Sequence, residues 1–366
     1  MKHFGNFVAL VILAVNALFT GLLLLSAYSP YLHPESHPVL SCFGLAFPVF
    51  AFINGCFLVF WLIIQRYKSA LLPLIGFLVC YSQIHTYLPI NFRSGHVPEG
   101  SIKFLSYNIM GFDGSSKKDG KNPILTYLKD SGADILCLQE YATVESPNFL
   151  RQKDIERALS AYPHHRINVV GTGNGHTNKI ACYSKYPILS ARVLDYPSEY
   201  NGSVIYEVAL KEDTITLINN HLESNKLTKA DKDIYEGILK SPEKEKVKSG
   251  ARLLIRKLAE ASVIRAPQAD TIAGEIARSK HPYIIVCGDF NDTPISYSHR
   301  IIAQDLDDAF TESGRGLGVS YNQNKFYFRI DNILISENLR AYNCTVDRSI
   351  KDSDHYPIWR YIAKRE

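Results

Sequence analysis

The first quarter of the sequence is almost without charge. No Asp, Glu, Lys or Arg lies within residues 4–34, and none lies within residues 39–64. A membrane span needs roughly 20 mostly apolar residues, so both stretches are long enough to cross a bilayer. A third apolar stretch, residues 70–90, contains a proline, a glutamine and a histidine. We therefore expect residues 1–90 to form a membrane anchor with three transmembrane helices.

The few charges near these stretches predict an orientation. Lys2 precedes the first stretch, Arg66 and Lys68 lie between the second and third, and the loop 28–38 has neither Lys nor Arg. Since Lys and Arg favour the cytoplasmic side, the chain after Ile90 lies outside the cytoplasm if the third stretch crosses, and inside it otherwise. We expect a multi-pass protein of a bacterial inner membrane whose large C-terminal domain is extracytoplasmic. The alternative of a cleaved signal peptide fits less well, because the apolar core is too long and a second span follows.

The remainder of the chain lacks a basic excess. Four of the 40 Lys and Arg and one of the 36 Asp and Glu precede Gly95, which leaves 36 against 35. Strong nucleic-acid binders usually carry a basic footprint, so the bulk charge does not indicate one.

A disulfide framework and a zinc motif are also missing. The seven cysteines show no CxxC spacing, and six of them lie in apolar runs, where a free thiol packs as a small hydrophobe. No internal repeat or low-complexity tract is present.

After a short polar linker at residues 91–100, the pattern becomes one of alternating strands and helices. Seven apolar, β-branched segments are predicted as strands: 102–109, 134–140, 178–184, 204–210, 214–222, 283–289 and 329–335. Residues 122–132 and 246–279 have apolar residues at helical spacing, with a break expected near Pro267. The charged segment 224–248 is predicted to be an inserted helix or loop. Residues 101–366 are therefore expected to form one catalytic domain.

Polar residues of types that can act in catalysis or metal binding recur where these strands end. They are Asn108, Glu140, Asn220, His221, Glu223, Asp289, Asn291, Asp331, Asp354 and His355. A carboxylate beside an amide can orient a water and hold a phosphate oxygen without adding charge. Each residue alone has an ordinary alternative, such as a cap, a solvated strand tip or, for Asp331, an ion pair with Arg329. The repetition at successive strand ends favours a shared site.

The order of these motifs resembles the endonuclease/exonuclease/phosphatase superfamily, the deoxyribonuclease I-like proteins. The resemblance covers about residues 101–361 and consists of SYNI, LCLQE, SKYPI, NHL, GDFND, RIDNIL and SDHYPI in the family's order. It implies a two-sheet α/β sandwich, with the active site formed by strand ends and loops at one edge.

The resemblance also implies metal ligands. Glu140 is expected to be the main metal carboxylate, with Asn108 nearby and Asp354 as a further ligand. Oxygen ligands with an amide favour Mg²⁺ or Mn²⁺ over zinc.

Catalytic roles follow from the same resemblance. Asp289 is expected to position or activate water, and Asn291 to hold that water or a phosphate oxygen. His355, oriented by Asp331, is expected to neutralise the phosphate, and His221 to contact it from the opposite side. A carboxylate behind a histidine fixes its tautomer and favours its charged form.

Substrate contacts are expected from Asn220 and Arg329. Two features depart from the family pattern: Asn332 follows Asp331 where relatives carry an aromatic residue, and the 224–248 insertion lies next to the His221 strand. The aromatic segment 322–328 either contacts a base or a lipid or, more simply, is an edge strand with packed rings.

The sequence thus predicts a membrane-tethered, divalent-metal-dependent phosphoester hydrolase. A phosphodiesterase of nuclease type acting by in-line water attack is preferred, with nucleic acid as the favoured substrate. A lipid phosphodiesterase or phosphatase is the alternative, since the charge is nearly neutral and the chain has an anchor. A non-catalytic binding module is less favoured, because a decayed site should have lost some of its acids and Glu140, Asp289, Asp331 and Asp354 are all present. A transporter is weaker still, because the chain has too few spans for a usual transport core. No protein partner is predicted.

Overall fold

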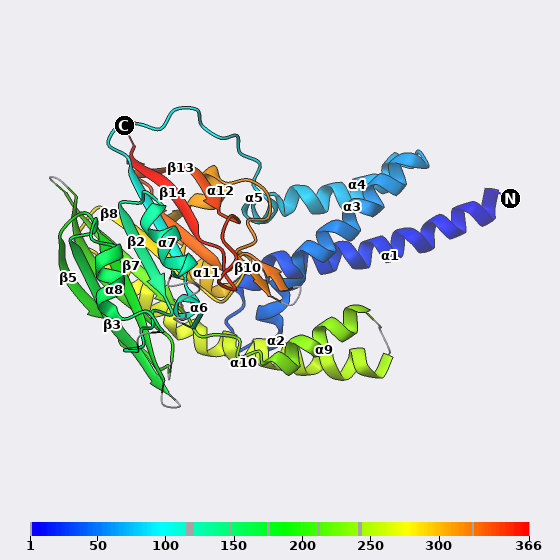
Figure 1. Cartoon of the computed structure of the whole chain (residues 1–366). Helices are drawn as coiled ribbons and strands as arrows, with labels where there is room; N and C mark the ends of the chain where they lie inside the picture. The colour runs from blue at the N-terminus through cyan, green and yellow to red at the C-terminus, as the bar shows by residue number, and fades with distance from the viewer. Residues whose placement is uncertain are drawn as a thin grey trace.

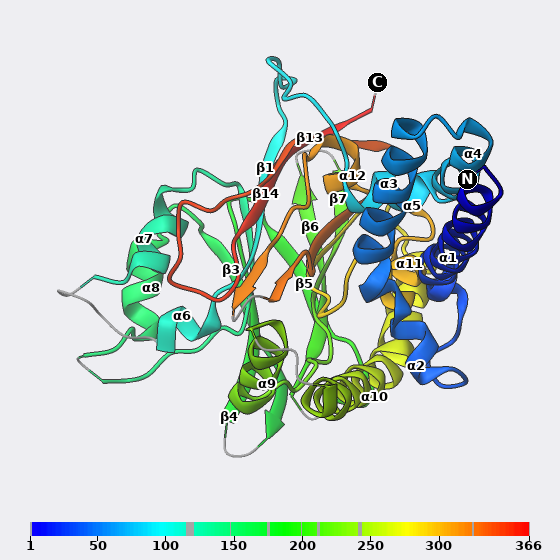
Figure 2. The same cartoon turned by 90° about the vertical axis from the view of Figure 1, so that its right-hand side faces the viewer.

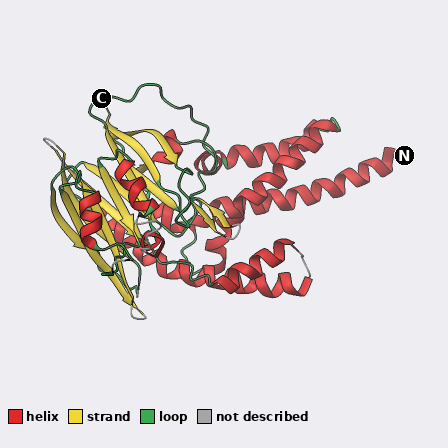
Figure 3. Cartoon of the chain, in the orientation of Figure 1, coloured by secondary structure: helices red, strands yellow, loops and turns green. Residues whose placement is uncertain are grey.

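The computed structural model consists of a helical N-terminal part and a two-sheet sandwich (Figures 1 and 3). It describes residues 2–114, 121–146, 148–173, 176–198, 200–210, 213–240, 244–323 and 326–365. The predicted α/β sandwich preceded by apolar helices is confirmed.

The N-terminal part is a bundle of apolar helices. In chain order they are α1 (Lys2–Tyr28), η1 (Ser29–Tyr31), α2 (Pro38–Ser41), η2 (Cys42–Ala46), α3 (Phe47–Ile63), α4 (Tyr67–Val79) and α5 (Tyr81–Tyr87). Two helical segments of the described chain, His3–Tyr31 and Pro38–Ile63, are long and apolar enough to cross a membrane. The third apolar stretch is a broken helix, because α4 and α5 meet at a bend of 65°. It makes a third span only if the bent pair is taken as one segment.

Polar side chains inside the bundle bond to one another. The Asn54 Oδ1 accepts from Thr20 Oγ1 at 2.7 Å and from Asn16 Nδ2 at 3.3 Å, and Trp61 Nε1 donates to Asn16 Oδ1 at 3.0 Å. All four residues are buried. Hydrogen bonds of this kind hold apolar helices together where no water is available, so these side chains join α1 to α3.

The two ends of the bundle differ in what they contact. At one end Arg66 Nη2 donates to Asn6 Oδ1 at 2.9 Å, which places the start of α1 beside the turn between α3 and α4. At the other end Arg300 Nε donates to the carbonyl of Pro30 at 2.8 Å. The sandwich therefore packs against η1, α2 and η2 and lies away from the turn between α3 and α4 (Figure 1).

Each half of the sandwich is a six-stranded sheet. The first sheet has the order β13 (Leu339–Val346), β14 (Ile358–Lys364), β1 (Ile102–Asn108), β2 (Ile135–Gln139), β4 (His176–Ser184), β3 (His164–Gly173). The second has the order β5 (Ile188–Val193), β6 (Gly202–Leu210), β7 (Asp213–His221), β8 (Tyr283–Asp289), β12 (Asp331–Ser336), β9 (Leu306–Asp308). Apolar residues of both inner faces form the central core.

Helices cover both outer faces (Figure 2). The first sheet is covered by α7 (Pro123–Asp130) and α8 (Gln152–Ala158), and the second by α10 (Lys244–Ala277) and α11 (Tyr297–Ile302). The shorter elements are α6 (Met110–Gly114), α9 (Lys229–Lys240), α12 (Ala309–Ser313), β10 (Tyr321–Gln323) and β11 (Phe326–Phe328). Central strands are covered on both faces, which explains their continuous apolar sequences.

The predicted helix break at Pro267 is wrong. Pro267 lies inside α10, which continues on both sides of it. Buried Ala269 and Ile272 of this helix pack on the second sheet, and this burial outweighs the backbone hydrogen bond that proline lacks. The 224–248 insertion forms a loop at 224–228, then α9 and the start of α10, apart from residues 241–243, which lie outside the described residues.

The N-terminal helices fit closely on the sandwich. A Cβ added to Gly44 of η2 would lie 1.9 Å from the carbonyl oxygen of Ile295, so only glycine allows this approach. Ile295 itself packs with Leu23, Ala27 and Phe47 of the helical bundle. The predicted linker at 91–100 is bound to the domain surface, since Asn91 Nδ2 donates to the carbonyl of Thr311 at 2.8 Å.

Candidate functional site

Four strands bring their carboxyl ends to one edge of the sandwich. β1 pairs in parallel with β2, and β7 with β8, and their registers place Asn108 beside Gln139 and His221 beside Asp289. β12 runs antiparallel to β8, which puts Asp331 opposite Asp289. Side chains from both sheets therefore converge at this edge, as the strand-end pattern predicted.

Backbone conformation at this edge is unusual. Glu140 and Asn291, each just beyond a buried strand, have positive φ values of 54° and 51°. Gly288 has φ of 123°, and a Cβ there would lie 2.0 Å from the carbonyl oxygen of Asn220. Such conformations cost on the order of 1–3 kcal/mol in non-glycine residues and are concentrated at functional sites.

Asp289 is the centre of the cluster. Asn108 Nδ2 donates to both Glu140 Oε1 (3.0 Å) and Asp289 Oδ2 (3.1 Å). His221 Nε2 lies 3.5 Å from Glu140 Oε1 and 3.8 Å from Asp289 Oδ2, and His355 Nε2 lies 3.6 Å from the same Asp289 oxygen. The other oxygen, Oδ1, accepts from the backbone N–H of Asn291 at 2.8 Å. Two imidazoles and one amide thus surround a single carboxylate oxygen.

His355 and Asp331 form a buried pair behind Asp289. His355 Nδ1 and Asp331 Oδ2 are 2.7 Å apart, and the two side chains are 5% and 1% exposed. Burial alone would lower the pKa of His355, but the charges of Asp331 and Asp289 and the hydrogen bond to Asp331 raise it well above its ordinary value. These contacts favour the charged form of His355, whose Nε2 lies 3.6 Å from Asp289 Oδ2 at the cavity wall.

His221 has the opposite character. Burial lowers its pKa despite the nearby charge of Asp289. Asn178 Nδ2 lies 3.0 Å from His221 Nδ1, and an amide nitrogen only donates, so Nδ1 accepts and Nε2 carries the proton. His221 is thus a neutral hydrogen-bond donor toward Glu140 and Asp289.

The carboxylates of the cluster are hard to ionise together. Burial raises the pKa of Asp289 to about 6, with His355 opposing the rise and Asp331 adding to it. Desolvation also raises the pKa of Glu140, against the hydrogen bond from Asn108. Negative charge in excess of the local positive charge makes this edge a favourable place for a cation.

One group of side chains among the described residues has the spacing of a metal site: one ligand atom from each of Asp289, Asp331 and His355 lies within 4.8 Å of the others. In that group His355 Nδ1 already bonds to Asp331 Oδ2. The residues expected from the resemblance to bind a metal, Glu140, Asp354 and Asn108, lie at the same edge, and Glu140 and Asp354 both line its cavity. Asn108 Oδ1 accepts from the Met110 N–H at 3.2 Å.

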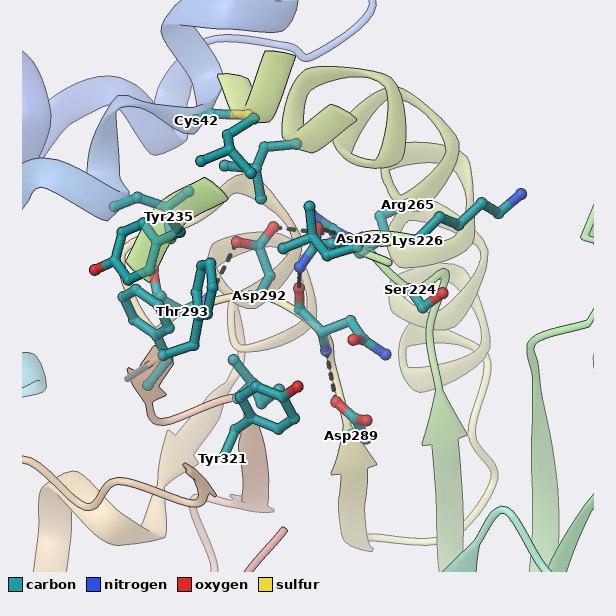
Figure 4. A pocket seen from close by; sticks show the side chains of 18 of the residues that line it. Cys42, Ser224, Asn225, Lys226, Tyr235, Arg265, Asp289, Asp292, Thr293 and Tyr321 are labelled. Carbon is teal, nitrogen blue, oxygen red and sulfur yellow. Dashed lines mark hydrogen bonds and ion pairs between the residues drawn. The ribbon is translucent and has the colours of Figure 1, made fainter. Parts of the chain in front are cut away.

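The cluster opens into a cavity of about 540 Å³ (Figure 4). Its polar end is lined by Glu140, His221, Asp289, Asp354 and His355, and Asn291 also lines it. In Figure 4 Asp289 lies at one end of this cavity and Cys42 of η2 at the other.

Eight of the ten predicted site residues lie together at this edge: Asn108, Glu140, His221, Asp289, Asn291, Asp331, Asp354 and His355. The Asn291 amide donates to the carbonyl of Leu222 at 3.0 Å, so its side chain holds the neighbouring loop in this structure.

The two residues predicted to bind substrate point elsewhere. Asn220 accepts from Ser203 Oγ at 2.6 Å and donates to the carbonyl of Cys287, because side chains alternate along β7 and only His221 faces the cleft. Arg329 is buried, 3.3 Å from Asp308 Oδ2, and stacks over the ring of Phe310. Arg329 therefore forms an ion pair, as the ordinary alternative expected, but its partner is Asp308 and not Asp331.

Two features of the site were not foreseen. Asn178, which fixes the His221 tautomer, is the third residue of β4, and a polar residue just before an apolar run was its only signal. The apolar walls of the cavity come from η2 and α10, far apart in the sequence, and no local pattern could join them.

Known proteins share this fold. A model of the Endonuclease/Exonuclease/phosphatase family matches residues 105–355, and one described as a domain of unknown function (DUF8431) matches residues 9–87. No curated protein matches the chain. Among solved structures, the endonuclease/exonuclease/phosphatase from Beutenbergia cavernae DSM 12333 is 13% identical, with 72% of each chain covered and a TM-score of 0.51. The human Nocturnin catalytic domain with bound sulfate anion is 14% identical, with 75% of this chain and 97% of that chain covered and a TM-score of 0.50.

The family match spans well over half of the chain and contains the whole cluster around Asp289. Members of this family are generally hydrolases of phosphoester bonds, and the fold of the catalytic domain agrees with theirs. The chain belongs to the endonuclease/exonuclease/phosphatase family.

Proposed function

We propose that this protein is a membrane-held, divalent-metal-dependent hydrolase that cleaves phosphodiesters by in-line attack of water. The observation that carries the proposal is the surrounding of Asp289 Oδ2 by Asn108, His221 and His355, all within 3.8 Å. A carboxylate with a pKa of about 6 is ionised at neutral pH and is basic enough to accept a proton from water.

The metal ligands in this proposal are Glu140 and Asp354, with Asn108 beside them. Their donors are oxygens, which suit Mg²⁺, with Mn²⁺ as an effective substitute. The site has four carboxylates, those of Glu140, Asp289, Asp331 and Asp354, and fewer positive charges. This excess of negative charge supports binding of a divalent cation. When bound, such an ion polarises a phosphoryl oxygen and neutralises charge that develops on it.

The protein side chains then divide the remaining work. Asp289 orients the water and takes its proton, while its Oδ1 stays bonded to the Asn291 N–H. His355, as an imidazolium backed by Asp331, donates Nε2–H to a phosphoryl oxygen. His221, as a neutral donor fixed by Asn178, binds a second oxygen. Fixed donors around the phosphate favour the more highly charged transition state over the substrate.

We also propose that the catalytic domain lies outside the cytoplasm of a bacterial cell, at the inner membrane. Lys2, Arg66 and Lys68 belong to the end of the bundle away from the catalytic domain, as the Arg66–Asn6 contact indicates. The excess of Lys and Arg at that end favours a cytoplasmic location for it. Protease added to spheroplasts should remove the domain while the membrane stays sealed, and protection of the domain would refute this orientation.

The substrate class within phosphodiesters was predicted to be nucleic acid, with lipid as the alternative. The net charge does not support a nucleic-acid groove, since the chain from Gly95 onward has 36 Lys and Arg and 35 Asp and Glu. The lining of the cavity favours the second candidate, which the next subsection develops.

The test is turnover of bis(p-nitrophenyl) phosphate by the full chain, with Mg²⁺ and then with excess chelator. We expect Mg²⁺-dependent release of nitrophenol that His355→Ala lowers by at least about 100-fold. Plasmid nicking in the same preparation assays the nuclease alternative. A folded, metal-binding protein that cleaves no phosphodiester would leave the non-catalytic binding module as the better account.

A further inference from the structure

The polar cluster around Asp289 and an apolar chamber share one cavity. We propose that this chamber holds the hydrocarbon chain of a membrane lipid whose phosphoester lies at the polar end. The inference rests on the proposed function, and it names the substrate class of the same site.

Four elements separated in sequence build three apolar walls. η2 contributes Leu45 and Ala46, and α10 contributes Ala251, Leu254, Ile255 and Leu258. The third wall is aromatic: Phe326 and Phe328 of β11 and Tyr235 of α9, with the Tyr235 and Phe326 rings 4.2 Å apart. Arg265 and Asp292, whose side chains pair at 3.3 Å, also line the cavity. A ligand that uses both the cluster around Asp289 and these walls therefore has a polar end and an apolar body.

Continuity with the candidate spans identifies the source of the ligand. η2 is followed directly by α3, and Gly44 of η2 touches Ile295, which lies close after Asn291 in the chain. In Figure 1 α9 and the first half of α10 extend from the catalytic domain on the same side as α1 and α3. The chamber thus lies where the spans meet the catalytic domain.

A second apolar groove lies between α2 and α10. It is lined by Pro38 and Val39 on one side and by Ile255, Val263 and Ile264 on the other. Ile255 also lines the catalytic cavity, so the groove and the cavity are separated only by this region of α10. Exposed Lys248, Arg252 and Arg256 flank the groove, and basic side chains at this level suit anionic lipid head groups.

Nucleic acid fits this lining less well. Two cationic side chains line the described cavity apart from its histidines, and both are engaged. Arg265 is buried and donates to the Glu223 carbonyl at 2.8 Å and to Asn225 Oδ1 at 2.9 Å, and Lys226 Nζ lies 2.9 Å from Glu223 Oε1. A polyanion would find few cations to neutralise successive phosphates.

If the chamber binds a hydrocarbon chain, kcat/KM should depend on the chain length of the substrate. Burial of each CH₂ is worth about 0.8 kcal/mol, which is about a fourfold gain in kcat/KM. This gain should continue with each added carbon until the chamber is filled, and then stop.

The experiment uses the full chain in amphipol, so that no detergent monomer competes for the chamber. The probes are p-nitrophenyl alkyl phosphodiesters, from methyl to octyl, below their aggregation concentrations, and the p-nitrophenyl ester of thymidine 5′-phosphate. We expect kcat/KM to rise up to about fourfold per carbon and to exceed that of the nucleotide ester.

Two variants test the chamber in different ways. Ile255→Glu places a charge in its wall, and Ala46→Trp fills its volume; each should flatten the chain-length dependence. The matched control is Val193→Glu on β5, also an exposed apolar residue (38% exposed, against 43% for Ile255), which should keep the dependence.

The outcomes separate the two claims. A flat dependence with the methyl ester cleaved would overturn the chamber and keep the proposed function; efficient cleavage of the nucleotide ester would then assign nucleotides. A dependence that persists in both Ile255→Glu and Ala46→Trp would come from solubility and would also overturn the chamber. Failure to cleave any ester would instead overturn the proposed function.

Discussion

Replacement of Arg329 by methionine should destabilise the protein without weakening substrate binding. Arg329 Nη1 lies 3.3 Å from Asp308 Oδ2, and their side chains are 2% and 7% exposed. His299 Nε2 is 3.5 Å from the same oxygen. Arg329→Met therefore leaves Asp308 buried and short of its main partner, which costs about 3–5 kcal/mol.

The same substitution removes a link to the helical bundle, because Arg329 Nη2 also donates to the carbonyl of Thr86 in α5. At about 2–4 °C per kcal/mol for a domain near this size, Tm should fall by about 6–20 °C. The double variant Arg329→Met/Asp308→Asn should lose clearly less, since it buries no unpaired charge. The assay is thermal unfolding of the full chain in amphipol, with KM for a soluble diester measured in the cold.

The sign of the pH dependence follows from Asp308. Burial alone would raise its pKa, but Arg329 and His299 hold the pKa well below its ordinary value. A depressed folded pKa gives stability that is present above the unfolded value, about 3.9, and is lost as pH falls through the folded value. The Tm gap between wild type and Asp308→Asn should therefore be full near pH 6 and shrink below about pH 4. A native Tm for Arg329→Met would refute this reasoning. A raised KM together with a native Tm would indicate instead that Arg329 binds substrate.

Other consequences concern the site itself. Asp289→Asn should lower metal-dependent turnover by at least about 100-fold with little change in Tm, and a native rate would remove Asp289 from the mechanism. Asn178→Ala frees the tautomer of His221 and should lower kcat/KM about 2–10-fold, measured on the same diester; no effect would mean that His221 is positioned by other contacts. Gly288→Ala drives a Cβ into the Asn220 carbonyl and should cost at least about 3 kcal/mol in chemical unfolding, so a neutral effect would contradict the register of β7 and β8.

The sequence predicted the strands because buried parallel strands have long β-branched runs, and it predicted most of the site because polar residues repeat at their ends. Parallel pairing brings carboxyl ends to one edge, so Glu140, Asp289 and His221 converge once the order of strands is known.

Side-chain direction and long-range packing could not be predicted from the sequence. Asn220 and Arg329 were expected at the substrate, but alternation along β7 turns Asn220 away, and the buried Asp308 takes Arg329. Pro267 signalled a break that the packing of α10 overrides. The chamber needs η2, α9, α10 and β11 together, and only the fold joins segments so far apart.

The expected preference for nucleic acid rested on the motifs alone. These motifs describe the groups that act on phosphorus, which serve a nucleotide and a lipid equally. The neighbouring surface carries the difference, and here it is apolar, aromatic and adjacent to the candidate spans.

The most direct test is to count Mn²⁺ bound to the metal-stripped full chain while turnover of bis(p-nitrophenyl) phosphate is followed in the same sample. The account predicts that turnover appears as the ion binds, and that Glu140→Gln loses both together while keeping its fold. Full turnover in the presence of excess chelator, or unchanged metal binding and turnover in Glu140→Gln, would contradict a metal-dependent phosphoesterase centre at this cluster.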